Sequence, residues 1–423
     1  MWAAPVETKG PVTQIHILSF EGPDAYARAG GIATRISGLA YGLADAGFDT
    51  HLWFVGDPER PGHERDGQLR LHRWCQWISR HHPGGVYDGE EGKRTDFVSS
   101  LPPFLLREYL APALDQPGRC VVLAEEWQTT DAILHLDWLL RGAALRDRVT
   151  ILWNANNTFG FDRIDWARLA TAAVITTVSR YMQHRMWAHG IDPIVIPNGL
   201  SGPALRRTDP DAVKVFERRV QHRVVLAKVA RWDPGKRWLL AIDTVGEMKR
   251  RGWKPLLIAR GGVEAHGSEV LGRAVARGLR VVEHPMVDGG IADLLDSMRD
   301  IHDVDMLSLR SPLAPAAARL LFRAASAVLA NSGHEPFGLV GLETMAAGGL
   351  ACTGSTGEDY AIPGWNALVL QSSDPREFIR LYDRLRVDRV AEQAMRRRGR
   401  LTAKQYAWNE IIRRNLLPRL GAA

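Results

Sequence analysis

The segment NSGHEPFGLVGLETMAAG, residues 331–348, decides the fold of this 423-residue chain. It follows the short apolar run 327–330, which has the length and composition of a buried strand, and the part from Gly338 onward has helical spacing. A loop that leads from a parallel strand into a helix N-terminus is where such sheets bind phosphate groups, because the first amides of the helix have no intrahelical partner. We therefore expect the amides of Gly338, Leu339 and Val340 to face a phosphorylated ligand.

Two carboxylates flank this helix start, Glu335 before it and Glu343 within it. Carboxylates in these positions would accept hydrogen bonds from sugar hydroxyls while the phosphates rest on the amides between them. The alternative is purely structural, because acids are also favoured at the positive end of a helix dipole. Glu335 would then cap the helix and Glu343 would be a surface residue.

The rest of the chain alternates short apolar runs with helix-length segments, which predicts parallel sheets with crossover helices. A first series of strands is expected at 14–20, 50–55, 120–124, 150–153 and 173–178, and a second at 223–227, 255–259, 280–283, 327–330, 350–353 and 367–370. The polar segment 201–223 separates the two series. Because the chain also exceeds the usual size of a single core, we predict two Rossmann-like, doubly wound α/β domains with a cleft between them.

The charge and cysteine content narrow the function classes. A net charge of +6 is compatible with phosphorylated substrates or an anionic membrane surface; nucleic acid is not expected, because no recognition motif accompanies the charge. The densest basic stretch, 376–400, is typical of a solvated helix, with peripheral membrane contact as the alternative. The three cysteines are far apart in the sequence, and no two of them have the spacing of metal ligands. Neither a metal site nor a disulfide framework is therefore expected.

The absence of an apolar run of ~18 residues and of a leader pattern in residues 1–20 predicts a cytoplasmic protein, or one that lies peripherally at the inner membrane face.

A second motif, Arg-Trp-Asp-Pro-Gly-Lys at 231–236, follows the expected strand 223–227. If a nucleoside diphosphate leaves with growing negative charge and no metal neutralises it, a fixed Arg231 and Lys236 would do so. The alternative without a function is that Arg231 and Lys236 are ordinary exposed cations of a loop.

These segments resemble the retaining glycosyltransferases of family 4 and the related starch and glycogen synthases, whose signature places Glu, seven residues and Glu around Pro-Phe-Gly-Leu. The resemblance implies the GT-B fold, in which two Rossmann-like domains face each other across a cleft and the last helix crosses back to the N-terminal domain. It implies domains at 1–203 (with helix 404–423) and 204–403.

The resemblance also implies transfer of a hexose-type sugar from a nucleotide-diphosphate donor to an acceptor hydroxyl, with retention and without metal or cofactor. The acceptor would be a carbohydrate, a lipid or another hydroxyl compound. In the family the first Glu contacts the transferred sugar and the second the nucleotide ribose, roles that we expect for Glu335 and Glu343. The other donor-binding positions implied are Gly30, Gly31, Arg231, Lys236, Phe337, Gly338, Leu339 and Val340.

The chain departs from the family on the acceptor side. Where the starch and glycogen synthases have His-Asp-Trp-His, residues 125–128 read Glu-Glu-Trp-Gln, and no His follows the next strand, where 153–157 read Trp-Asn-Ala-Asn-Asn. We expect Glu125, Asn154 or Asn156 to replace the family's catalytic-site His, and Trp127 to join these Asn residues as a candidate sugar contact. Glu125 is a candidate base and, equally, a candidate helix-start or surface acid.

The segment 70–109 is expected on the acceptor side, where Arg73 or Arg80 could meet an acidic group, although Trp74 and Trp77 could instead pack in the core. Two other functions stay open. One is a catalytically weak nucleotide-sugar-binding or regulatory protein, which the missing His motivates. The other is an epimerase or a phosphorylase on the same fold.

Overall fold

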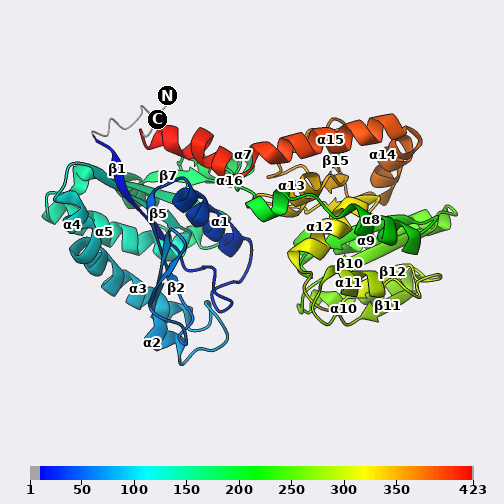
Figure 1. Ribbon diagram of the computed structural model, residues 1–423, viewed down its shortest axis with the longest axis horizontal. Helices are drawn as coiled ribbons and strands as arrows, with labels where there is room; N and C mark the ends of the chain where they lie inside the picture. The colour runs from blue at the N-terminus through cyan, green and yellow to red at the C-terminus, as the bar shows by residue number, and fades with distance from the viewer. Residues whose placement is uncertain (1–9, 422–423) are drawn as a thin grey trace. The chain divides into compact units, whose positions relative to one another are not determined.

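The computed structural model describes residues 10–421 (Figure 1). Residues 1–9 and 422–423, where the expected N-terminal domain begins and the expected C-terminal helix ends, lie outside the described residues. The chain divides into two compact units, Met1–Gly199 with Trp408–Ala423, and Leu200–Ala407. Each unit is built on one twisted, mostly parallel sheet, which confirms the expectation of two Rossmann-like α/β domains.

The sheet of the first unit has the strand order β3-β4-β2-β1-β5-β6-β7-β8, and only the β3–β4 pair is antiparallel. Its strands are β1 (Val12–Leu18), β2 (Asp49–Val55), β3 (His63–Asp66), β4 (Leu69–Trp74), β5 (Arg119–Glu125), β6 (Val149–Ala155), β7 (Val174–Thr177) and β8 (Ile194–Val195). The strand order reverses between β1 and β5. Ligands of such sheets bind beside the carboxyl ends of the strands at this reversal.

The helices of the first unit are α1 (Gly31–Asp45), α2 (Gln76–Ser79), α3 (Glu90–Leu105), α4 (Ala111–Leu114), α5 (Thr130–Gly142), α6 (Trp166–Ala172), α7 (Arg180–Trp187) and α16 (Trp408–Ile411). Helix α16 packs on α1 through Trp408, which is 4% exposed. Glycines make this possible, because a Cβ on Gly38 would lie 2.0 Å from Trp408 Nε1 and one on Gly199 2.5 Å from its ring. The expected return of the last helix to the N-terminal domain is therefore confirmed.

Of the two arginines that segment 70–109 could offer to an acidic acceptor, Arg73 is not available. Its first residues belong to β4, which pairs with β2 inside the sheet, and Arg73 is buried there. The Arg73 guanidinium donates to Asp24 at 2.7 Å and to Glu64 at 2.7 Å, so it has no group left for an acidic acceptor. Trp74 is half-buried, whereas Trp77 is 65% exposed.

The sheet of the second unit is parallel throughout, with the strand order β11-β12-β10-β9-β13-β14-β15. Its strands are β9 (Val224–Val229), β10 (Pro255–Arg260), β11 (Val281–His284), β12 (Met306–Leu309), β13 (Ala327–Ala330), β14 (Ala351–Thr353) and β15 (Leu368–Val369). Here the order reverses between β9 and β13. The two loops that follow these strands contain the predicted motifs 231–236 and 331–348.

Helices cover both faces of this second sheet (Figure 1). They are α8 (Pro210–Arg219), α9 (Trp238–Arg250), α10 (His266–Ala276), α11 (Ile291–Asp296), α12 (Pro315–Ala324), α13 (Leu339–Ala347), α14 (Pro375–Val387) and α15 (Arg389–Gln405). Successive residues of a strand pack into the two hydrophobic cores on opposite faces of the sheet. Leu226 packs with residues of α9, α10 and α14, and Val225 packs with residues of α8, α11 and α12. This two-sided burial explains why the strands read as continuous apolar runs.

None of the helices formed by residues 10–421 combines the length and the apolar character needed to cross a membrane.

Candidate functional site

The loops after β9 and β13 lie against each other in the second unit. The Gly333 amide donates to the Gly235 carbonyl at 2.8 Å, which joins the two loops directly. Behind them, the buried Lys228 of β9 donates to Asn331 Oδ1 at 3.0 Å and to the Leu329 carbonyl at 2.9 Å. Burial lowers the pKa of Lys228 to about 7. This lysine, which the sequence did not single out, fixes the first residue of the signature loop.

Lys236 and Glu335 meet where these loops join. Lys236 Nζ lies 2.5 Å from Glu335 Oε2, and the two side chains are 25% and 16% exposed. The turn η6 (Pro234–Lys236) that presents Lys236 is capped by Asp233, whose side chain accepts from the Gly235 amide at 2.7 Å. The structure thus brings together two residues that the sequence singled out from segments a hundred residues apart.

Arg231 is placed differently from Lys236. Its side chain is exposed and has no hydrogen bond or ion pair with another residue of the range 10–421. Its carbonyl accepts from Trp238 Nε1 at 2.8 Å and from the Asp233 amide at 2.8 Å, so the loop backbone is held while the guanidinium is not. The side chain is therefore available to a ligand.

Helix α13 begins directly after Gly338, and no side chain caps its N-terminus. The Tyr360 hydroxyl donates to the Gly338 carbonyl, and Phe337 packs against the rings of Tyr360 and Tyr406 at centroid distances of 5.8 and 6.1 Å. Phe337, expected among the donor-binding residues, is thus 5% exposed and holds the loop from within. The amides of Leu339 and Val340 lack a side-chain cap, as a phosphate-binding helix start requires.

Glu343 lies on α13, half-buried, and its carboxyl group has no hydrogen bond or ion pair within residues 10–421. Burial raises the pKa of Glu343 to about 7. A partly buried carboxyl group without a partner is costly unless a ligand supplies one. This finding does not fit the alternative in which Glu343 is an ordinary surface acid.

The glycine-rich loop after β14 presses on the backbone of Glu335. The Glu335 amide donates to Thr356 Oγ1 at 2.9 Å. A Cβ on Gly357 would lie 2.1 Å from the Glu335 carbonyl oxygen and 2.2 Å from that of Pro336, so only glycine fits there. The same loop contains Glu358. Burial, and after it the neighbouring charge of Glu335, raises the pKa of Glu358 to about 7.

In the first unit, the acidic end of β5 lies at the sheet's reversal. Glu125, 1% exposed, accepts from Arg35 Nε of α1 at 3.2 Å, from Asn154 Nδ2 at 2.8 Å and from Asn156 Nδ2 at 2.7 Å. Three predicted residues are therefore brought together. The Glu125 carboxylate is fully engaged by these donors, whereas Asn156 Oδ1 is buried without a partner among the described residues.

Glu126, which the sequence analysis did not select, is the unusual residue of this cluster. Its backbone has φ 69° and ψ 163°, a conformation that costs a non-glycine residue roughly 1–3 kcal/mol and is typical of functional sites. Its carboxyl group accepts from the Asn156 amide at 2.6 Å and from Asn157 Nδ2 at 3.1 Å. Burial, assisted by Glu125 and Glu21, raises the pKa of Glu126 to about 8, so it is mostly protonated at neutral pH.

Trp127 is less accessible than a sugar-stacking residue would be. It is 6% exposed; the Arg163 guanidinium lies 4.5 Å from the ring centroid, and a Cβ on Gly160 would lie 2.5 Å from the ring. Its ring is therefore packed against neighbouring residues.

The Gly30-Gly31 loop is exposed, and a Cβ on either glycine would meet nothing within 4 Å. The fold itself therefore does not require glycine there. However, Glu21 Oε2 accepts from the Ala29, Gly30 and Ala33 amides at 3.3, 3.1 and 3.0 Å. The Glu21 carboxylate thus already accepts from the amide of Gly30, one of the donor-binding positions that the resemblance implies. The path of the loop between Glu21 and these amides decides this pairing, and no sequence motif marks it.

Within residues 10–421, no three His, Cys, Asp or Glu side chains are grouped as metal ligands would be.

No family model matches the chain, and no curated protein matches it. Solved structures do. Sucrose-phosphate synthase from Thermosynechococcus elongatus is 16% identical with a TM-score of 0.65, over 94% of this chain and 96% of that one. The catalytic domain of starch synthase IV from Arabidopsis thaliana, bound to ADP and acarbose, is 14% identical with a TM-score of 0.65, over 96% and 99%. HepE from Anabaena, in complex with UDP, is 14% identical with a TM-score of 0.63, over 97% and 100%. At these identities the likeness shows the GT-B fold alone.

Proposed function

We propose that this chain is a glycosyltransferase that moves a hexose-type sugar from a nucleotide-diphosphate donor to an acceptor hydroxyl, with retention and without a metal or cofactor. One observation carries the proposal: Lys236 pairs with Glu335 where the β9 and β13 loops join, and the segment that holds Glu335 also holds the uncapped start of α13 and the unpartnered Glu343. These groups match the charged, hydroxylated parts of a sugar nucleotide. The similar HepE has been solved with UDP-glucose and starch synthase IV with ADP, which is consistent with this donor class.

The donor's diphosphate is proposed to bind the first amides of α13 and the Lys236 ammonium, with Arg231 turning in from the exposed loop. Glu335 accepts from hydroxyls of the sugar, and Glu343 accepts from the ribose hydroxyls. As the anomeric C–O bond breaks, its electron pair moves onto the diphosphate, and the fixed cations stabilise that charge. The acceptor oxygen bonds to the anomeric carbon from the same face and its proton passes to the departing phosphate, so retention needs no separate base.

The acceptor is proposed to bind the first unit at the ends of β5 and β6. Asn156 Oδ1, buried without a partner, would accept from an acceptor hydroxyl. The neutral Glu126 beside it would donate or accept a hydrogen bond without adding charge. Glu125 would position the two asparagines rather than act as a base, because Arg35 and both amides already occupy its oxygens.

A nucleotide-sugar-binding protein with weak transfer activity is the second candidate. The observation that favours it is Glu21, which holds amides of the Gly30 loop. A thermal-shift screen with UDP-, GDP- and ADP-sugars identifies the donor, and release of nucleoside diphosphate in the presence of candidate acceptors then separates the two functions. Donor binding without sugar release or transfer would favour the second candidate; no response to any sugar nucleotide would contradict both.

The Glu335→Ala variant is expected to weaken use of the sugar donor by about 10- to 100-fold, the loss that follows removal of a charged hydrogen-bond partner. Binding of the free nucleoside diphosphate should be unchanged or tighter, because Lys236 loses its competing partner. The measurement compares the donor's kcat/KM with the Kd of the nucleoside diphosphate. Equal losses in both would contradict contact between Glu335 and the sugar.

Glu343 should make nucleotide binding pH-dependent. With a pKa of about 7 in the free protein, its carboxyl group is mostly neutral at pH 6 and ionised at pH 8. Since the ionised form accepts from both ribose hydroxyls, the Kd should fall by about tenfold over this range. The Glu343→Gln variant should bind more weakly at pH 8 and lose this part of the dependence. Titration of the nucleotide's own phosphate affects both proteins equally. An identical pH profile in the wild type and the variant would therefore show that Glu343 does not contact the nucleotide.

A further inference from the structure

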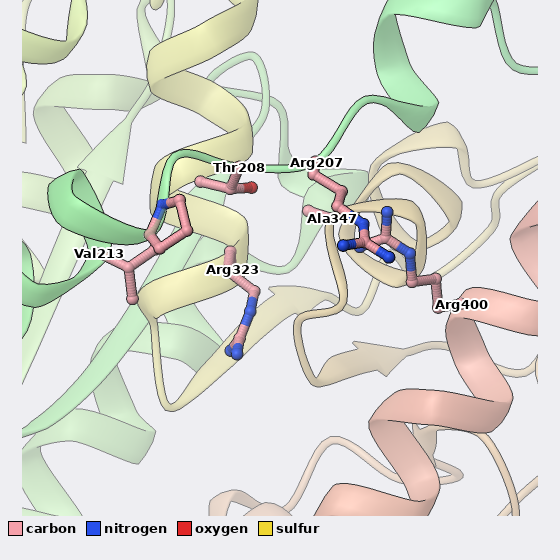
Figure 2. A pocket seen from close by; sticks show the side chains of 7 residues that line it. Arg207, Thr208, Val213, Arg323, Ala347 and Arg400 are labelled. Atoms are coloured by element: carbon pink, nitrogen blue, oxygen red, sulfur yellow. The ribbon is translucent and has the colours of Figure 1, made fainter.

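A small cavity of about 240 Å³ lies in the second unit at the C-terminal end of α13. It is lined by Arg207, Thr208, Val213, Arg323, Ala347 and Arg400 (Figure 2), among others. These residues come from the segment before α8, from α8 itself, and from α12, α13 and α15. The length of α13, roughly 13 Å at 1.5 Å per residue, separates the cavity from Gly338, so it is distinct from the proposed donor site.

Three arginines line this cavity, and no acidic residue lines it with them. The guanidinium groups of Arg207, Arg323 and Arg400 form no hydrogen bond or ion pair with any of residues 10–421. Arg323 Nε and Arg400 Nη1 both come within 4 Å of the point where a Cβ on Gly348 would lie, and in Figure 2 the Arg207 side chain extends toward that of Arg400. The surrounding chain therefore places three guanidinium groups along one small cavity.

The charges nearest to Arg323 are of both signs. Burial, then Arg396 and Arg400, lower the pKa of Arg323, while Glu217 and Glu392 oppose them. Glu392 is itself paired with Arg396 at 2.8 Å. The C-terminal dipole of α13 favours nearby cations by ~0.3–1 kcal/mol, but it supplies no anion for three of them.

The remaining lining indicates the ligand. Thr208 Oγ1 is buried and has no hydrogen-bond partner in the described part of the chain. Its hydroxyl group can therefore donate a hydrogen bond to an oxygen of a ligand. Guanidinium groups bind phosphate oxygens with two parallel hydrogen bonds. The volume is below the ~300–1,000 Å³ of sites for drug-sized ligands, which favours a small anion.

We propose that this cavity binds the phosphate group of a small soluble compound, either inorganic phosphate or a phosphate monoester. The ligand would join the segment before α8 to α12 and α15. The first of these begins just after Leu200 and the last ends just before Ala407, and Leu200 and Ala407 pair as an isolated bridge. Binding would therefore tie together the two ends of the second unit.

The test is isothermal titration calorimetry at constant ionic strength, with inorganic phosphate and with glycerol 3-phosphate as probes and chloride as the blank. The proteins are the wild type, Lys236→Ala, Arg397→Gln and the double variant Arg323→Gln/Arg400→Gln. Arg397 is the matched control, since it is an exposed arginine of α15 that does not line the cavity. Lys236→Ala removes the competing cation of the donor site.

Saturable binding should occur in the wild type, Lys236→Ala and Arg397→Gln, and weaken at least tenfold in the double variant. The double variant should unfold at the same or a higher temperature without ligand, because the repulsion between its arginines is removed. No saturable binding to the wild type, or binding lost in Lys236→Ala and kept in the double variant, would overturn the site. Co-sedimentation of the protein with phosphatidic acid vesicles, combined with no binding of either soluble probe, would show that the ligand is a lipid headgroup and not a soluble compound.

Discussion

Replacing Lys236 by alanine is expected to lower the rate constant of sugar transfer by about 10²–10³-fold, the effect of removing one preorganised charge-stabilising group from an active site. The ammonium group is the cation that the structure fixes beside Glu335, 2.5 Å away. Its charge is needed most when the anomeric bond breaks and the diphosphate gains an electron pair. The measurement is kcat with the donor that the thermal-shift screen identifies.

The matched control is Lys214→Ala. Lys214 is an exposed lysine of α8, paired with Asp211, and belongs to neither the β9 nor the β13 loop. Both variants should keep the wild-type unfolding temperature, because exposed and partly exposed ion pairs contribute ~0–1 kcal/mol. A near-normal rate in Lys236→Ala would remove this lysine from leaving-group stabilisation and with it the central step of the mechanism.

Replacing Gly357 by alanine is expected to lower transfer about 100-fold although Gly357 bears no reactive group. The added Cβ would lie 2.1 Å from the Glu335 carbonyl oxygen and 2.2 Å from that of Pro336, both backbone atoms. One of the two loops must therefore move, and Glu335 moves with its own backbone. Displacements of about 1 Å at a reacting centre cost roughly 10²-fold in rate.

The control for this variant is Gly272→Ala in α10, where a Cβ meets nothing within 4 Å and the backbone is helical. That change should stabilise the helix by ~0.5–1 kcal/mol and leave transfer unchanged. A Gly357→Ala protein with wild-type kcat/KM for the donor would show that the loop after β14 does not set the position of Glu335.

The fold was predictable from the sequence because the buried strands of a parallel sheet are apolar on both faces. The runs at 120–124 and 255–259 appear in the structure as β5 and β10 with nearly the same limits. Some strands were missed, β4 and β12 among them. In β4, Leu69–Trp74, charged and apolar residues alternate, so it lacks the continuous apolar run by which the other strands were recognised. β12, Met306–Leu309, is largely apolar but has only four residues, and its composition does not separate it from a helix segment.

The arrangement of the candidate site was predictable only in part. Lys236, Glu335 and Glu343 come from local motifs at the ends of strands, where topology alone predicts a ligand. Glu126 was not selected, because its strained backbone and its bonds to Asn156 and Asn157 depend on how β5 and β6 lie side by side.

The position of Trp408 has a consequence for how the protein is made. The second unit is one continuous stretch of chain, Leu200–Ala407, whereas the first needs Trp408 to fill the space left by glycines of α1. As the chain leaves the ribosome, the later unit therefore holds all of its residues before the earlier one does. The N-terminal sheet must wait, with its α1 groove uncovered, until Trp408 has been synthesised, so it is the part that chaperones would have to protect.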